Sequence, residues 1–326
     1  MPAITLIEAV NLALAHELKR DNEVVVLGED VGVNGGVFRA TNGLAQKFGK
    51  DRVIDTPLAE SMIAGLAVGM AAQGLKPIAE MQFEAFMMPA YDMIYNHIAR
   101  MRLRTRGRIT LPMVIRAPWG GGIHAPEHHS DSPEAQCAHI PGLKVVFPSN
   151  PSRAYGLLLA AIRDPDPVLF FEPKRVYRIV KHEIEDTGEE YPLGTCFVDR
   201  EGTDITLISW GAMMHETLQA ADKLASLGVS AEVIDVATIS PLDIDTILES
   251  VAKTGRVCIV CEAPRSGSWA SEIAAQIAED GLFHLLAPIG RVTGYDTTMP
   301  YYKLEKQYMP SVDRIIEEAR RLMEYK

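Results

Sequence analysis

The chain has 326 residues, of which 47% are hydrophobic and 23% are charged, and its formal net charge is -11. This length suits two globular domains, and the negative charge argues against nucleic acid as a main partner. The longest apolar run, between Glu60 and Lys76, is too short to span a membrane, and residues 1–5 lack the pattern of a signal peptide. We therefore expect a cytoplasmic protein with no membrane or nucleic-acid partner.

The first half of the chain alternates between helical and extended patterns. Strands are predicted near 24–27, 52–54, 77–80, 113–116, 143–147 and 168–171, and helices near 5–19, 41–48, 61–73, 89–103 and 151–163. The helix that follows Glu60 is apolar nearly all round, which predicts burial on every side. Thr56 suits its N-cap and Pro57 its first helical position.

The second half repeats this alternation after an irregular acidic stretch. Strands are predicted near 205–210, 231–236, 256–261 and 290–292, and helices near 213–227, 242–254, 268–279 and 310–323. The expected fold class is therefore α/β, with two open, mostly parallel sheets that carry helices on both faces. We expect domains over 1–180 and 205–326, joined by a linker over 181–204.

Four segments of the first half directly follow predicted strands: the Gly28–Gly32 loop, the turn at Glu60, Phe83–Phe86 and His124–His129. Ligands bind parallel sheets at the carboxyl ends of the strands, so these segments could line one rim. Glu60 could merely complement the helix dipole, or it could serve as an acid or base near neutral pH.

Two metal readings are disfavoured by the residues themselves. His124, His128 and His129 have ligand-like spacing, but Pro126 argues against a regular helix there and no cysteine pair lies nearby. Cys258 and Cys261 fall on a predicted strand, where residues three apart point to opposite faces. No phosphate-binding glycine motif and no Gly-x-Ser-x-Gly nucleophile motif occurs, so proton transfer by the histidine loop and Glu60 remains.

Several motifs together resemble one family. The segments that carry the resemblance are Gly28–Gly32, Gly36–Phe38, Asp55–Glu60, Gln82–Phe86, His129-Ser130 with Ser132–Glu134, Pro141–Val146, Ala161–Asp164 and Phe171–Lys174. Over its whole length the chain resembles the beta subunit of the thiamine-diphosphate-dependent decarboxylase component of 2-oxo acid dehydrogenase complexes, a transketolase-like family. The resemblance implies a pyrimidine-binding domain followed by a transketolase C-terminal-like domain.

The resemblance also implies roles for individual residues. Glu60 would hydrogen-bond the aminopyrimidine ring of thiamine diphosphate and favour its imino tautomer, and Phe86, or else Phe83, would pack against that ring. Glu29, in the first motif, would join the cofactor site. His129, the histidine that precedes serine, would assist proton transfer or orient the lipoyl group. The turn that contains Ala161, Asp164 and Asp166 resembles the family's potassium site.

The chain contains no Gly-Asp-Gly, the family's motif for the diphosphate and its magnesium. We therefore expect half a site, completed by an alpha subunit in an α2β2 heterotetramer, with a lipoyl acyltransferase core docked on the C-terminal domain. Pyruvate is the favoured substrate, with 2-oxoisovalerate or acetoin as alternatives. A non-catalytic assembly subunit is a competing reading from another class, and a self-sufficient transketolase-like enzyme is a third.

Overall fold

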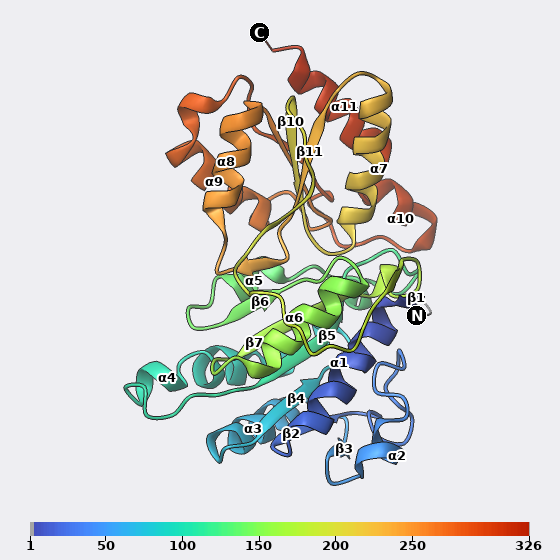
Figure 1. Ribbon diagram of the computed structural model, residues 1–326, viewed down its shortest axis with the longest axis vertical. Helices are drawn as coiled ribbons and strands as arrows, with labels where there is room; N and C mark the ends of the chain where they lie inside the picture. The colour runs from blue at the N-terminus through green and yellow to red at the C-terminus, as the bar shows by residue number, and fades with distance from the viewer. Residues whose placement is uncertain (1–2, 326) are drawn as a thin grey trace. The chain divides into compact units, whose positions relative to one another are not determined.

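Residues 3–325 of the computed structural model are described below, and they divide into two compact units (Figure 1). The first unit contains the chain up to Trp119 together with Gln136–Leu193. The second contains Gly120–Ala135 together with the residues from Gly194 onward. The histidine loop thus belongs to the second unit, although the sequence places it inside the first domain.

The first unit is built on a parallel sheet whose strands follow the order β6-β7-β5-β4-β2-β3. These strands are β2 (Val24–Gly28), β3 (Val53–Asp55), β4 (Lys76–Glu80), β5 (Val114–Trp119), β6 (Lys144–Val146) and β7 (Val168–Pro173). Every residue of β2, β5 and β7 is buried, as expected of apolar runs in a sheet covered on both faces. A short pair, β1 (Ala3–Thr5) and β8 (Lys181–Glu183), is antiparallel.

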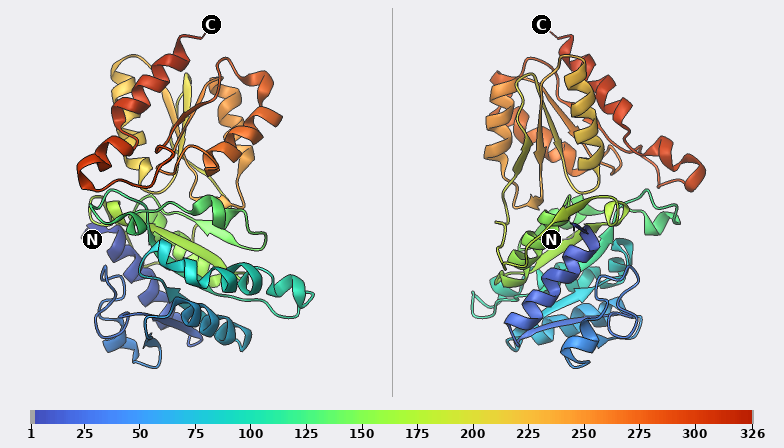
Figure 2. Two further views of the ribbon diagram at one scale, coloured as in Figure 1. Left: turned by 180° about the vertical axis from the view of Figure 1, so that it is seen from behind. Right: turned by 45° about the vertical axis from the view of Figure 1, so that its right-hand side comes forward.

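The helices of this unit are α1 (Leu6–Arg20), α2 (Leu44–Phe48), α3 (Glu60–Ala72), α4 (Met101–Arg104) and α6 (Pro151–Arg163); α5 (Glu134–Ala138) lies at the boundary between the units. Helices α1 and α6 pack side by side (Figures 1 and 2). The fully buried carboxylate of Glu17 on α1 accepts hydrogen bonds from Arg163 of α6 at 2.7 and 3.1 Å. Buried apolar side chains on both helices and the ion pair between Glu17 and Arg163 therefore hold α1 against α6.

Three local predictions for this unit are wrong. Helix α3 begins at Glu60 with Ala59 as its N-cap, and within residues 3–325 the Thr56 hydroxyl oxygen, the group that an N-cap would use, has no hydrogen-bond partner. The same helix is not buried all round, since Met62 and Leu66 remain 42% and 39% exposed. The helix expected over 89–103 is divided into a 3-10 segment η1 (Glu84–Ala90), a π segment η2 (Met93–Ile98) and α4.

The second unit has a five-stranded sheet in the order β14-β13-β10-β11-β9, parallel except for β9. Its strands are β9 (Phe197–Arg200), β10 (Ile205–Ser209), β11 (Ala231–Asp235), β13 (Val257–Val260) and β14 (Gly290–Val292), and a short β12 spans Thr238–Ser240. Its helices are α7 (Met213–Ser226), α8 (Ile244–Thr254), α9 (Trp269–Asp280), α10 (Tyr302–Tyr308) and α11 (Val312–Met323), and short 3-10 turns are η3 (Glu127–His129) and η5 (Leu282–His284).

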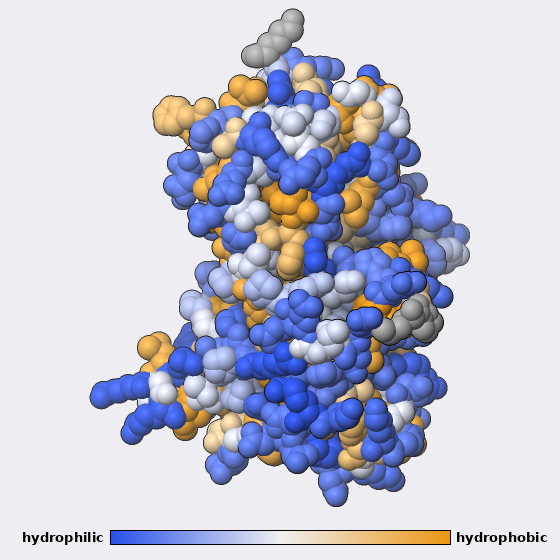
Figure 3. All heavy atoms as spheres, viewed as in Figure 1, coloured by the Kyte–Doolittle hydropathy of each residue, from blue (hydrophilic) through white to orange (hydrophobic). Residues whose placement is uncertain are grey.

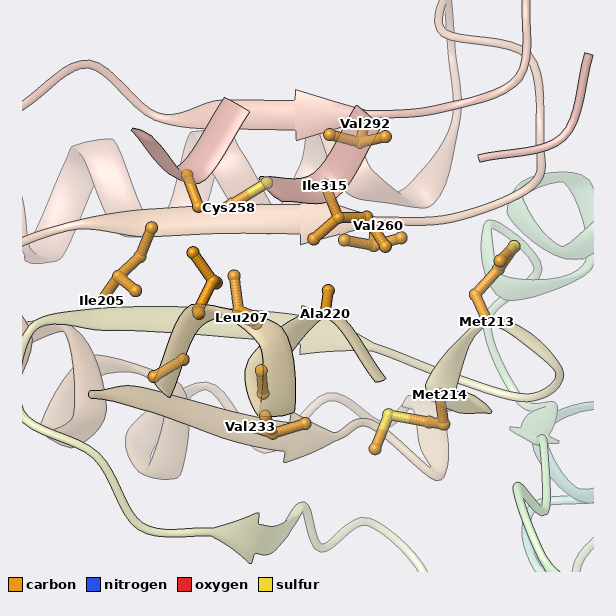
Figure 4. Packing of buried hydrophobic residues seen from close by; sticks show 14 of the residues in the cluster. Ile205, Leu207, Met213, Met214, Ala220, Val233, Cys258, Val260, Val292 and Ile315 are labelled. Atoms are coloured by element: carbon orange, nitrogen blue, oxygen red, sulfur yellow. The ribbon is translucent and has the colours of Figure 1, made fainter. Parts of the chain in front are cut away.

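The core of this unit lies between the sheet and the helices α7 and α11 (Figure 4). Leu207, Val233 and Val260 extend from neighbouring strands toward Ala220 of α7 and Ile315 of α11, and all five are buried. Helices α8 and α9 pack together on the opposite face (Figure 2). This burial of apolar side chains on both faces explains why the strands read as continuous apolar runs.

The segment expected to be a linker, 181–204, contains two strands. β8 pairs with β1 of the first unit, and β9 pairs with β11 of the second. The boundaries at 180 and 205 stay predictions. Hydrophilic side chains cover most of the face drawn in Figure 3, with hydrophobic side chains in smaller groups. No helix within residues 3–325 is long and apolar enough to cross a membrane.

Candidate active site

The carboxyl ends of β2, β3 and β4 lie next to one another in the sheet of the first unit. The amide of Thr56 donates to the Gly28 carbonyl at 2.9 Å, and the Asp55 carboxylate accepts from the Gly32 amide at 2.6 Å. These bonds tie the loop after β2 to the turn after β3. Three of the four segments predicted to line a rim therefore follow adjacent strand ends, while the His124–His129 loop belongs to the second unit.

Glu60 is the first residue of α3 and is half-buried. Within residues 3–325 its carboxylate accepts no hydrogen bond and forms no ion pair, although it stands at a helix N-terminus, where negative charge is favoured. Glu29, in the loop after β2, lies close enough to sense this charge. Burial, followed by the nearby charges of Asp30 and Glu60, raises the pKa of Glu29 above its usual value.

An aromatic cluster lies beside the first turn of α3. The rings of Phe83 and Phe86 meet edge to face with centroids 5.4 Å apart, and Phe38 lies 5.5 Å from Phe83. The Ser61 hydroxyl donates to the Pro89 carbonyl at 2.5 Å, which holds η1 and its Phe86 against α3. Phe83 and Phe86 are only half-buried, so this cluster leaves aromatic surface exposed next to the turn that carries Glu60.

Beneath these aromatic residues lies a buried ionic network that the sequence reasoning missed. Arg116 of β5 donates to Glu172 at 2.6 Å and to Glu80 at 2.8 Å, and the Tyr177 hydroxyl donates to Glu172 at 2.7 Å. Burial raises the pKa of Glu80, as does the charge of Glu172, against the opposing effect of Arg116. The available signal was a charged residue at the end of each apolar strand run.

The loop after β5 opens with Gly120, Gly121 and Gly122, and it reaches the turn η3 that ends at His129. His129 is half-buried and its Nδ1 atom is buried, whereas the side chain of His128 is 56% exposed. The two imidazole rings lie 4.4 Å apart. The Nδ1 atom of His124 lies 2.6 Å from Oε2 of Glu305 on α10. Within residues 3–325 no three histidine, cysteine or acidic side chains gather as a metal site.

The residues of the predicted potassium turn follow the end of α6. Ala161 is buried in the last turn of the helix. The carboxylate of Asp164 pairs with Lys144 and accepts from the Asp166 amide at 2.9 Å, and Asp166 pairs with Arg102 at 2.6 Å. Because both side chains are engaged in these contacts, a cation here would depend on main-chain carbonyl oxygens.

The four cysteines are free thiols and all are buried. Cys258 lies on β13 and Cys261 directly after its end. Burial raises the pKa of both thiols above its usual value, which keeps them protonated and unreactive.

Two domain families match the chain, one over each half. The transketolase pyrimidine-binding domain matches residues 2–180, and the transketolase C-terminal domain matches residues 194–315. A split-gene transketolase solved as an inactive beta4 tetramer aligns with a TM-score of 0.81 and 23% identity, covering 100% of both chains. This similarity confirms the predicted two-domain α/β fold class.

Curated relatives match over their full length. The pyruvate dehydrogenase E1 component subunit beta of Bacillus subtilis is 49% identical over 325 residues, covering 100% of both chains, and that of Acholeplasma laidlawii is 50% identical over 322 residues, covering 99% of this chain and 98% of the relative. The 2-oxoisovalerate dehydrogenase subunit beta of Bacillus subtilis is 50% identical over 327 residues, again covering 100% of both. The chain therefore belongs to the transketolase-like family of 2-oxo acid dehydrogenase beta subunits, as its motifs indicated.

Proposed function

We propose that this chain is the beta subunit of a pyruvate dehydrogenase first component, which decarboxylates pyruvate oxidatively and acylates a lipoyl group together with an alpha subunit. Thiamine diphosphate is the cofactor that membership of the family implies. When bound, it supplies the nucleophilic carbon that adds to a 2-oxo acid and stabilises the charge left when carbon dioxide departs. The observation that carries the proposal is the Glu60 carboxylate, available beside an exposed aromatic surface.

The residues of the first unit fit the pyrimidine half of this cofactor. Glu60 would accept a hydrogen bond from the protonated ring nitrogen, and Phe86, with Phe83 behind it, would cover the face of the ring. Glu29 would add a second carboxyl group, whose pKa is raised by burial and by the nearby charges of Asp30 and Glu60. These side chains need little rearrangement, because backbone hydrogen bonds already hold the turns that carry them.

The diphosphate half is assigned to the alpha subunit. The sequence has no Gly-Asp-Gly, and a magnesium ion bound to a diphosphate needs such oxygen ligands. We also propose that the main-chain carbonyls of the turn from Ala161 to Asp166 hold a potassium ion. The Lys144 and Arg102 partners of Asp164 and Asp166 would then fix the shape of that turn rather than compete for the ion.

His129 is proposed to move a proton at the reacting carbonyl or to orient the incoming lipoyl group. Its Nδ1 atom is buried, so we assign its Nε2 atom to the contact with the substrate or the lipoyl group. An imidazole suits both roles, because its usual pKa lies near neutral pH.

The surface of α3 supports assembly with a partner subunit. Met62 and Leu66 are 42% and 39% exposed and lie four positions apart on α3, and Leu58, 70% exposed, lies in the turn just before the helix. Exposed apolar side chains that gather on one helix face are typical of protein contacts. We further propose an α2β2 heterotetramer whose lipoyl acyltransferase core docks on the C-terminal unit.

A branched-chain substrate is the second candidate, because the 2-oxoisovalerate dehydrogenase relative is as similar as the pyruvate dehydrogenase relatives. Turnover of pyruvate and of 2-oxoisovalerate by the same assembled enzyme distinguishes the two substrates. If the assembled protein binds an acyltransferase but turns over neither pyruvate nor 2-oxoisovalerate, the chain would instead be a non-catalytic assembly subunit.

The central experiment is calorimetric titration of magnesium thiamine diphosphate into the chain alone and into the chain mixed with its alpha subunit. We expect heat only from the mixture, and tight binding by the chain alone would contradict the half-site. Glu60→Gln should lower turnover about 100-fold or more, since it removes a group that acts on proton transfer. Asp245→Asn is the matched control, because Asp245 is an exposed carboxylate in the first turn of α8.

A further inference from the structure

Two buried carboxylates from late in the chain bind the main chain of the histidine loop. The Glu262 carboxylate, just after β13, accepts from the Gly121 amide at 3.0 Å. Glu305 of α10 accepts from the amides of Gly122 and His124 at 3.0 and 3.1 Å. Both carboxylates are almost completely buried, at 1% and 2% exposure, and all of these residues belong to the second unit.

Two glycines at the start of this loop lie close to side chains from later in the chain. Gly120 has a φ of +86°, and a Cβ atom there would lie 2.5 Å from a carboxylate oxygen of Glu262. A Cβ atom on Gly121 would collide with the Met299 side chain. Glycine at position 120 therefore suits both the positive φ and the close approach of the Glu262 carboxylate.

His124 is held by its side chain as well as by its amide. Its Nδ1 atom lies 2.6 Å from Oε2 of Glu305, and the Tyr302 ring packs edge-on against the imidazole. The residue has a φ of +61°, a left-handed conformation that costs free energy for a side chain with a Cβ atom. Its three contacts with α10 offset this cost and restrain the loop.

The restrained segment leads directly into the turn that presents His129. Pro126 limits the backbone before the turn, the His129 amide donates to the Pro126 carbonyl at 2.9 Å, and the Ser130 amide donates to the Glu127 carbonyl at 2.9 Å. Only Ala125 separates Pro126 from the residue that Glu305 binds. The direction in which His129 points thus depends on where the two carboxylates hold residues 121–124.

We propose that Glu305, with Glu262 beside it, is a positioning residue for His129. The two carboxylates do not touch the substrate; they fix the main chain that carries the imidazole. This inference rests on the proposed function of His129 in the decarboxylase reaction. A displaced imidazole would slow the steps that need it and would leave the binding of cofactor and pyruvate largely unchanged.

The test compares Glu305→Ala with Glu305→Gln in the full chain assembled with its alpha subunit. The glutamine amide oxygen can still accept from the two main-chain amides, and its NH2 group can donate to His124, so this variant should retain most of the turnover. Glu305→Ala should lower kcat by about tenfold to a hundredfold with the KM for pyruvate nearly unchanged. Glu318→Ala is the control, because it removes an ion pair with Arg321 on α11.

Hydrogen exchange of the peptide spanning residues 120–130 in the full chain provides a second readout that needs no activity. The amide hydrogens of this peptide should exchange with solvent faster in Glu305→Ala than in wild type. In Glu305→Gln and Glu318→Ala they should exchange at the wild-type rate. Unchanged exchange in Glu305→Ala, or faster exchange with an intact kcat, would overturn the inference. An assembled wild-type enzyme that turns over no 2-oxo acid would instead overturn the proposed function.

If Glu305→Ala does not fold, Glu262→Ala replaces it in both measurements. That variant removes the bond to the Gly121 amide and keeps both Glu305 bonds to the loop, so we expect faster exchange of the same peptide and a smaller loss of kcat. Wild-type exchange and wild-type kcat in this variant would count against the inference.

Discussion

The ammonium group of Lys174 lies 2.9 Å from a carboxylate oxygen of Glu84, and both side chains are completely buried. The same ammonium lies 5.5 Å from the centre of the Phe83 ring. A buried charge pair is retained only while each charge neutralises the other. This pair therefore connects the stability of the first unit to the aromatic surface proposed to receive the cofactor.

Lys174→Met should lower the free energy of unfolding by about 3–5 kcal/mol, because it leaves the Glu84 charge buried without its cation. Urea unfolding followed by circular dichroism measures the change. Lys181→Met, at an exposed position of β8, is the control. The double variant Lys174→Met with Glu84→Leu should recover much of the loss, and a double variant as unstable as the single one would contradict the ionic explanation.

Glu17 should make the stability of the chain depend on pH. Burial alone raises its pKa, but hydrogen bonds from Arg20 and Arg163 outweigh burial and hold the pKa below its usual value of 4.5. The stabilisation is therefore present above pH 4.5 and is lost as the pH falls through the lowered pKa.

Glu17→Gln should cost about 1–3 kcal/mol at neutral pH, because it removes hydrogen bonds to charged partners. The difference from wild type should narrow as the solution becomes more acidic than pH 4.5. Urea unfolding over a series of pH values tests this, with the exposed Glu23→Gln as control. A difference that stays constant into strongly acidic solution would show that the ionised form of Glu17 is not what stabilises α1 against α6.

Phe86→Ala should raise the concentration of thiamine diphosphate that the assembled enzyme needs for half-maximal activity. Loss of one aromatic contact is worth about 0.5–1.5 kcal/mol, which corresponds to roughly twofold to tenfold. Activity measured against cofactor concentration tests this. Phe283→Ala is the control, because Phe283 is fully exposed in the second unit. An unchanged cofactor requirement in Phe86→Ala would remove Phe86 from the site.

Leu66→Glu should weaken assembly with the alpha subunit, because it places a charge in the apolar face of α3. Light scattering after size exclusion measures the mass of the complex, and subunits separating at micromolar concentration would support the prediction. Leu227→Glu, at an exposed position after α7, should assemble normally. Normal assembly of Leu66→Glu would mean that another surface carries the contact.

The sheet strands were predictable because strands buried on both faces consist of short runs of mostly apolar residues. The runs that became β2, β5 and β7 are mostly apolar, with Arg116 and Glu172 as the charged residues of β5 and β7, and each run can be recognised from its own residues. The start of α3 was not predictable in this way. Thr56 is a good N-cap residue, but its hydroxyl oxygen caps no amide within the described residues, and the helix begins four positions later, at Glu60. Thr56 instead uses its amide, which donates to the Gly28 carbonyl across the sheet.

The site was predictable to the extent that local motifs carry it. Glu60, Phe86 and His129 came from short segments that resemble a family, and their proposed roles stay predictions. The support for these segments is long-range: Glu305 is 181 positions from the His124 amide that it binds. A glutamate in a helix gives no sign of such a partner, so the sequence does not predict the role of Glu305, and the spacing of His124 from His128 resembles that of metal ligands.

The distance along the chain between the histidine loop and its two carboxylates also sets an order of events during synthesis. The loop at residues 120–130 leaves the ribosome long before Glu262 and Glu305 are made. A chain that ends before α10 would carry His129 without Glu305, and one that ends before residue 262 would lack both carboxylates. The loop can therefore reach its restrained conformation only after Glu305 has been synthesised. In a truncated chain the unrestrained loop would be a preferred site of proteolytic cleavage.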